Sequence, residues 1–331
     1  MPIYQTIIES IKNPEECFKK RQALIREIEQ LTNRRFLVYV ADINKPQSVL
    51  EPDDKIGFSD LIQDIKEEEV DILINSPGGF AEVTEAIVGM LRSTFKSIRF
   101  AIPNMAKSAG TLLVLSGNEL LMDHRSELGP IDPQIAYPTI DGVKREAAED
   151  ILEGFDEVKK ALITDGPAAT PAYVPLLNKY SIGLLRSCRN AIQLSRELAE
   201  GWLRTYMFAG EPDSFKPRQI ASFFAGRPDT LSHNRAIRID KCLELGMKVT
   251  DLRGIQHEKL AAKIWEIWCL YAFHFERTPV YKMFENSAGC NLNRQSVAFQ
   301  LVRRPSSPPE QPEKPIPPTR ESHQPTQDVG S

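Results

Sequence analysis

The chain has 331 residues, of which 41% are hydrophobic and 26% are charged. These proportions are typical of a soluble globular protein and exclude a collagen-like, coiled-coil or wholly disordered chain. The formal net charge of −4 provides no general attraction for phosphate backbones, so we expect no nucleic-acid partner.

The sequence also bears on location and cofactors. No apolar run approaches the roughly 18 to 20 residues that cross a bilayer, and the charged N-terminus does not resemble a signal peptide. Any contact with a membrane is therefore expected to be peripheral. Five scattered cysteines without a CxxC pair predict a reduced, cytoplasmic protein without a zinc site. We expect neither a metal nor an organic cofactor.

The first elements along the chain are predicted to be helices. Apolar residues at helical spacing begin at Ile3, and a second stripe follows Asn13-Pro14. The period then changes, because Phe36 to Ala41 is a short run of aromatic and branched residues that suits a buried strand. We therefore expect residues 1–34 to form N-terminal helices that precede the core.

Strands and helices are then predicted to alternate. The expected strands are 36–41, 70–75, 98–102 and 119–122, and the expected helices are 59–66, 81–93 and 108–116, with a turn at 53–56. Short connections between such elements imply parallel strands joined by right-handed crossovers. Residues 35–145 are thus predicted to be an α/β core with a parallel sheet.

The character of the chain changes beyond residue 145. Helical periodicity over 146–163, 176–208 and 258–273 predicts that residues 146–302 are a largely helical extension that completes the fold. Residues 305–325 contain eight of the 24 prolines. A disordered, Pro-rich tail is therefore expected over 303–331, either simply solvated or carrying a proline-rich binding motif.

Two corners that follow strands contain the residue types that chemistry needs. The first is Asn75-Ser76-Pro77-Gly78-Gly79, where two glycines permit positive φ and close backbone approach. Peptide N–H groups at such a strand end can form an oxyanion hole or a phosphate cradle. The alternative is an ordinary turn between a strand and a helix.

The second corner runs from Asn104 to Thr111 and contains Ser108 at the start of an apolar helix. This serine is either a helix cap or a nucleophile. Adjacent parallel strands bring both corners to one edge of the sheet. The N–H groups of Gly79 and Ala109 are then expected to converge on one oxygen while the Ser108 hydroxyl attacks the attached carbon.

These motifs resemble known peptidase families. The S-P-G-G corner followed by a small-residue corner with serine resembles the Clp protease proteolytic subunit and signal peptide peptidase A. The strings N-x-A-x-S-A-G-T and S-E-L-G-P-I-D-P-Q, with the later C-R-N-A-I-x-L-S-x-E-L-A, S-H-N-R-A-I and L-G-M-K-V, resemble the serine dehydrogenase proteinase family. The resemblance covers about residues 35–285.

The resemblance implies a crotonase-like ClpP/SppA fold, self-association and a serine nucleophile at Ser108. It also implies oxyanion donors at Gly79 and Ala109, with Gly78 in the same substrate-binding corner. The predicted function is therefore a serine peptidase that hydrolyses peptide or protein substrates as a homo-oligomer. The alternatives are a catalytically inactive oligomeric scaffold of the same fold and a crotonase-like enzyme acting on acyl thioesters.

The general base is left open by the residues. The Clp subunits use a histidine from the region after the nucleophile helix, and no histidine stands there in this chain. By elimination a lysine is predicted, as in signal peptide peptidase A. The candidates are Lys160 first, then Lys179 and Lys144, with His124 and His233 as alternatives.

Overall fold

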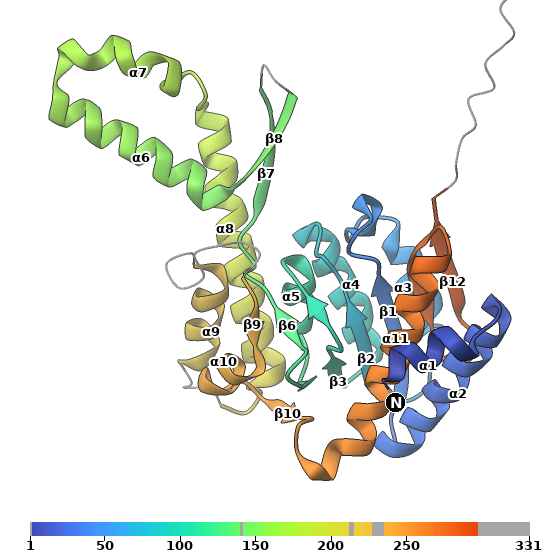
Figure 1. Cartoon of the computed structure of the whole chain (residues 1–331). Coiled ribbons are helices and arrows are strands. Elements are labelled where there is room, and N and C mark those ends of the chain that lie inside the picture. Colours follow the sequence, from blue (N-terminus) through green and yellow to red (C-terminus); the bar gives the residue numbers. More distant parts are fainter. Residues whose placement is uncertain (1, 140–141, 212–214, 227–234, 297–331) are drawn as a thin grey trace, which may run out of the picture. The chain divides into compact units, whose positions relative to one another are not determined.

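A seven-stranded sheet forms the centre of the molecule (Figure 1). The computed structural model describes residues 2–139, 142–211, 215–226 and 235–296. The order across the sheet is β10-β5-β3-β2-β1-β11-β12. Neighbours from β10 to β1 pair in parallel, and β11 and β12 join antiparallel at one edge. The strands are β1 (Arg35–Ala41), β2 (Glu69–Asn75), β3 (Ser97–Ala101), β5 (Glu119–Met122), β10 (Val249–Asp251), β11 (Val280–Glu285) and β12 (Asn291–Gln295).

Helices cover both faces of this sheet, so its central strands are apolar on both sides. One face packs against α3, α4, α5, α8 and α9, and the other packs against α1, α2 and α11. The helices are α1 (Ile3–Ser10), α2 (Pro14–Thr32), α3 (Asp54–Ile62), α4 (Ala81–Thr94), α5 (Ala109–Val114), α6 (Ala148–Asp165), α7 (Thr170–Leu177), α8 (Ile182–Trp202), α9 (Lys216–Ala225), α10 (Ile239–Glu244) and α11 (Glu258–Arg277).

Two smaller sheets complete the described chain. Short strands β4 (Met105–Ala106), β6 (Glu127–Leu128) and β9 (Ile237–Arg238) form one, and the hairpin of β7 (Gln134–Thr139) and β8 (Gly142–Ala147) forms the other. The elements β7, β8, α6 and α7 are here called the arm. A small apolar cluster holds the arm to α8, separately from the two clusters on the central sheet. Figure 1 shows α6 and α7 beyond the end of α8 that leads away from α5.

The predicted α/β fold with a mainly parallel core is confirmed by this topology. Two details differ from the expectation. The helix predicted over 59–66 begins at Asp54 and ends at Ile62, so the predicted turn at 53–56 is wrong. Residues 146–302 are less uniformly helical than predicted, because they also contain β9, β10, β11 and β12.

The predicted Pro-rich tail over 303–331 lies outside the described residues. Within the part of the chain that is described, no helix is both long and apolar enough to span a bilayer.

Candidate functional site

The two glycine- and serine-containing corners lie side by side at one edge of the sheet. β2 ends at Asn75 and runs into the first corner, and the chain reaches the second corner after β3. The N–H of Ser76 donates to the Met105 carbonyl at 3.0 Å, and the N–H of Lys107 donates to the Ser76 carbonyl at 3.0 Å. The corners are therefore joined by backbone hydrogen bonds, as expected from adjacent parallel strands.

Asn75 is the side chain that ties this edge together. It is fully buried, and its amide nitrogen donates to the Ala41 carbonyl at the end of β1, at 2.9 Å. Its amide oxygen accepts from the Asn104 side chain at 3.0 Å and from the Met105 N–H at 3.2 Å. From the sequence, Asn75 is predicted only as the last residue of a strand and the first residue of a corner. A buried asparagine at a strand end is the signal that marks it, because each of its polar atoms needs a partner.

Ser108 occupies a backbone conformation that non-glycine residues rarely adopt. Its φ is 50° and its ψ is −122°. The N–H of Gly110 donates to the Lys107 carbonyl at 2.7 Å, which closes a turn with Ser108 at its first central position. Turns of this kind usually have glycine there, because a Cβ atom is unfavourable at positive φ. Such strain concentrates at functional sites.

The hydroxyl of Ser108 does not cap the helix that follows it. Its side chain makes no capping hydrogen bond to α5, although serine at this position normally accepts from the second or third helical N–H. Among the described residues, no hydrogen bond to the Ser108 hydroxyl is recorded, and the side chain is half-buried. The helix-cap alternative therefore lacks its defining contact.

Gly78 brings the diglycine corner into contact with the serine. Its φ is +98°, and a Cβ atom there would lie 2.6 Å from the Lys107 carbonyl oxygen and 2.7 Å from Ser108 Cβ. The same Cβ would lie 3.0 Å from the Ala109 nitrogen. Only glycine permits this approach.

Two amide groups at this corner remain available to a ligand. The N–H of Gly78 donates to the Ser76 hydroxyl at 3.2 Å, and that of Gly110 is used in the turn. Within the described ranges, the N–H groups of Gly79 and Ala109 have no recorded acceptor. These are the two groups that the sequence predicts to be oxyanion donors.

Thr111 packs the following segment onto the serine corner. Its hydroxyl donates to the Ala106 carbonyl at 2.6 Å and accepts from the Gly129 N–H at 2.9 Å. Lys107 lies next to the serine but extends to β6, where its ammonium pairs with Glu127 at 3.1 Å and donates to the Leu128 carbonyl at 3.0 Å. The ammonium of Lys107 is therefore directed at β6.

The lysines predicted as bases belong to the arm and to the turn that follows α7. Lys160 is exposed on α6, which packs against α7, α8 and β8, whereas α5 packs against α4, α8 and β4. Figure 1 shows α6 apart from α5. Lys144 pairs with Glu146 on β8, and Lys179 is exposed.

Of the two histidines predicted as alternative bases, the structure describes His124, and no hydrogen bond joins it to Ser108. His124 is exposed after β5, and its carbonyl accepts a hydrogen bond from Arg238. His233 lies outside the described residues. The identity of the base stays a prediction.

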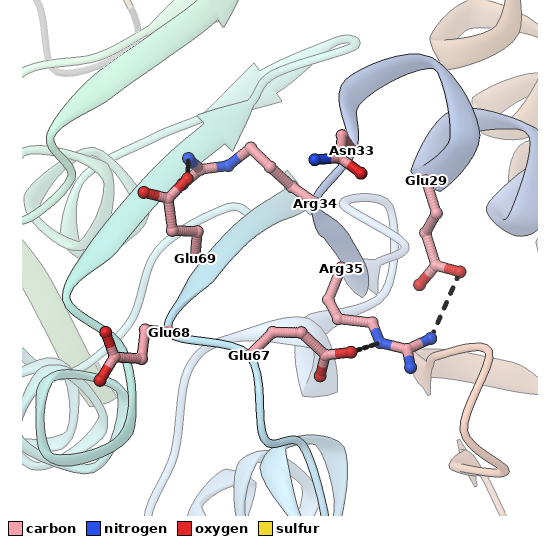
Figure 2. Close-up of a pocket in the computed structure, with 7 residues that line it drawn as sticks. All are labelled: Glu29, Asn33, Arg34, Arg35, Glu67, Glu68 and Glu69. Carbon is pink, nitrogen blue, oxygen red and sulfur yellow. Dashed lines mark hydrogen bonds and ion pairs between the residues drawn. The ribbon is translucent and has the colours of Figure 1, made fainter.

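A charged hollow of about 520 Å³ lies at the opposite edge of the sheet, where β1 and β2 begin (Figure 2). Figure 2 shows Arg35 between Glu29 and Glu67, while Arg34 pairs with Glu69. The hollow is lined by two arginines and four glutamates, and the ion pairs between them give it the character of a surface ion-pair network. In the described part of the chain, no group of three or more His, Cys, Asp or Glu side chains is placed to hold a metal ion.

Comparison with known proteins adds relatives to this geometry. An uncharacterized protein of Methanocaldococcus jannaschii is 27% identical over 218 residues, which is 59% of this chain and 73% of that protein. A second uncharacterized protein of the same organism is 39% identical over 70 residues, or 21% of this chain and 24% of that protein. Neither name states an activity.

Among solved structures, a mutant of the membrane-bound stomatin-specific protease 1510-N is similar with a TM-score of 0.38 and 15% identity. The similarity covers 64% of this chain and 79% of that one. A score this low does not by itself establish a common fold. The family model of the ClpP-like SDH-type serine proteinases matches residues 58–159. This region, which includes both corners, is similar to the ClpP-like SDH-type serine proteinases, and the resemblance predicted from the motifs is confirmed there.

Proposed function

We propose that this protein is a serine peptidase in which Ser108 is the nucleophile. The family match supports a ClpP-like serine peptidase in general. The observation that supports Ser108 most directly is its φ of 50°, held with its side chain not capping α5. A catalytic role explains why this serine keeps an unfavourable backbone conformation although its side chain does not cap the helix.

In the proposed mechanism the Ser108 hydroxyl attacks a peptide carbonyl carbon while a base takes its proton. The carbonyl oxygen becomes an oxyanion, which accepts hydrogen bonds from the N–H groups of Gly79 and Ala109. Each such donor typically contributes about 10²- to 10³-fold in rate. Collapse of this intermediate releases the amine as it takes up the proton, and water then hydrolyses the acyl-serine ester.

We further propose a lysine as the base, with Lys160 as the first candidate and Lys144 and Lys179 as alternatives. A lysine can accept a proton only when it is neutral, and burial on substrate binding or on self-association favours the neutral form. The exposure of Lys160 on α6 therefore calls for a change of environment before catalysis. We propose that the protein acts on peptides or proteins as a homo-oligomer.

A fluorophosphonate probe tests the nucleophile. Wild-type protein is expected to be labelled on Ser108 and to hydrolyse casein or peptides, and Ser108→Ala is expected to lose both. Ser93→Ala is the matched control, because Ser93 is an exposed serine on α4 whose hydroxyl donates to the Met90 carbonyl.

Three results would contradict the proposal. Labelling that persists in Ser108→Ala would remove this residue as the nucleophile. Turnover of acyl-CoA thioesters that is insensitive to the substitution would favour a crotonase-like enzyme. Oligomer formation by wild-type protein with neither labelling nor hydrolysis would favour a scaffold.

A further inference from the structure

Strand β11 contains a lysine whose side chain is completely buried. The Lys282 ammonium lies 2.8 Å from one carboxylate oxygen of Asp54, whose side chain is also 0% exposed, and 3.1 Å from Glu51. Its third partner is a backbone group, since it donates to the Val49 carbonyl oxygen at 2.7 Å. Lysine is almost never fully buried unless it is paired. The carboxylates account for its charge, but the bond to Val49 connects it to the site.

From that bond, hydrogen bonds lead through two peptide groups to the proposed oxyanion hole. The peptide that joins Val49 to Leu50 accepts from Lys282 through its carbonyl and donates through its N–H to the Gly78 carbonyl at 2.7 Å. The Gly78 carbonyl in turn belongs to the peptide that carries the Gly79 N–H. A chain of hydrogen bonds therefore runs from the buried ammonium to the proposed donor.

The far end of this chain is the Gly79 N–H, which belongs to the diglycine corner that contacts the serine through Gly78. Leu50 bonds to the residues on either side of Gly79, because it also accepts from the Phe80 N–H at 3.1 Å. In such a parallel bridge the N–H of the middle residue points away from the partner. Hydrogen-bonded chains polarise their members, so a bond at one end strengthens the donor at the other.

The position of Gly79 also depends directly on Leu50. A Cβ atom at Gly79 would lie 2.2 Å from the Leu50 oxygen and 2.4 Å from its nitrogen. Nothing separates the two backbones, so a shift of Leu50 displaces the Gly79 N–H. Lys282 bonds to the neighbouring carbonyl of Val49 and to Asp54 at the start of α3, and thereby holds the segment on both sides of Leu50.

We propose that Lys282 is a positioning residue for the oxyanion hole, acting through the Val49–Leu50 and Gly78–Gly79 peptides on the Gly79 N–H. This inference rests on the proposed peptidase function. Lys282 lies 174 positions after the serine in the sequence. In this proposal it affects the rate of attack by the serine without contacting the substrate.

The test is Lys282→Met, which keeps the length of the side chain and removes the donor. The rate of fluorophosphonate labelling and kcat for a peptide substrate are expected to fall by about tenfold or more, with KM nearly unchanged, because the lost interaction acts on the transition state. The matched control is Arg21→Met, which breaks the fully buried Arg21–Glu285 pair on the opposite face of β11. Folded Arg21→Met protein is expected to be labelled at the wild-type rate.

A double variant covers the risk that an unpaired Asp54 prevents folding. Asp54→Asn with Lys282→Met removes both buried charges, a change that folded proteins often tolerate. The same fall in kcat with unchanged KM is expected. A wild-type kcat in a folded Lys282 variant, or an equal loss in Arg21→Met, would overturn the positioning role. Failure of wild-type protein to label at Ser108 would instead refute the proposed function.

Discussion

The backbone of Ser108 stores free energy at the proposed nucleophile. A left-handed residue with a Cβ atom costs roughly 1–2 kcal/mol relative to glycine. We therefore expect Ser108→Gly to raise the free energy of unfolding by about 1 kcal/mol while it abolishes probe labelling. Ser108→Ala keeps the Cβ and should lose labelling without this gain. Urea unfolding of the three proteins measures the difference, and a Ser108→Gly variant less stable than Ser108→Ala would place the strain elsewhere.

Gly79 and Gly89 form a matched pair of glycines. A Cβ at Gly79 overlaps the Leu50 backbone, whereas a Cβ at Gly89, in the middle of α4, has no atom within 4 Å beyond the adjoining backbone of its own helix. Gly79→Ala is expected to lower the free energy of unfolding by about 1–3 kcal/mol and to slow labelling of Ser108. Gly89→Ala should instead stabilise by roughly 0.5–1 kcal/mol, because alanine favours the helix. Equal behaviour of the two variants would contradict the close contact with Leu50.

At the scale of elements, the central parallel strands were predictable and the antiparallel strand β11 was not. β1 and β2 are short runs of large apolar residues, which is how strands buried on both faces appear in a sequence. β11 has the sequence Val-Tyr-Lys-Met-Phe-Glu, in which Lys282 and Glu285 suggest exposure. Both are fully buried in ion pairs with residues far away in the chain, Asp54 and Arg21. The sequence likewise does not predict that α3 begins at Asp54, because Lys282, the partner of this buried carboxylate, lies far away in the chain.

The buried histidine of α11, His274, makes the stability of the fold depend on pH. Burial of His274, with the positive charges of Arg21 and Lys45, lowers the pKa of its imidazole to about 4. In the unfolded chain the His274 imidazole binds a proton below its ordinary pKa of about 6.5. In the folded protein it binds one only near pH 4 and below. Burying the neutral imidazole therefore costs no stability from proton binding above about pH 6.5. As the pH falls toward 4, the free energy of unfolding decreases by about 1.4 kcal/mol per pH unit.

His274→Gln removes this titration and retains a polar side chain. The fall in Tm between pH 7 and pH 4.5 is expected to be smaller in the variant than in wild type. Thermal unfolding over this range measures it, and parallel curves for the two proteins would show that His274 already titrates normally when folded.

At the scale of the whole molecule, the sequence predicts that the two corners meet, because adjacent parallel strands end at one edge of a sheet. It does not predict what holds them. Asn75 finds its partners in β1 and in the second corner, and Leu50 braces the diglycine from a segment without a recognisable motif. Such contacts depend on how the elements pack, which local pattern does not specify. The base is harder still to predict, since the candidate lysines lie outside the central sheet and the helices packed on it.

The location of the candidate lysines makes a prediction about assembly. The arm has its own small apolar cluster and exposes large apolar side chains, among them Val143 at 75% and Ile163 at 74%. Packing these side chains against a second copy would remove apolar area from water. Because α6 carries Lys160 away from α5 within one chain (Figure 1), we expect the arm of one copy to serve the serine of another.

Mixing inactive variants tests this arrangement. Ser108→Ala and Lys160→Met are each expected to be inactive, and their mixture is expected to regain peptide hydrolysis, because some sites then combine an intact serine with an intact lysine. A mixture of Ser108→Ala with Ser108→Gly is the control, since no site in it has a nucleophile. If the first mixture stays as inactive as the control, then Lys160 acts within its own chain, which requires α6 to approach α5. Full activity of Lys160→Met alone would transfer the role of base to another residue, and the same mixing experiment then applies to Lys144 and Lys179.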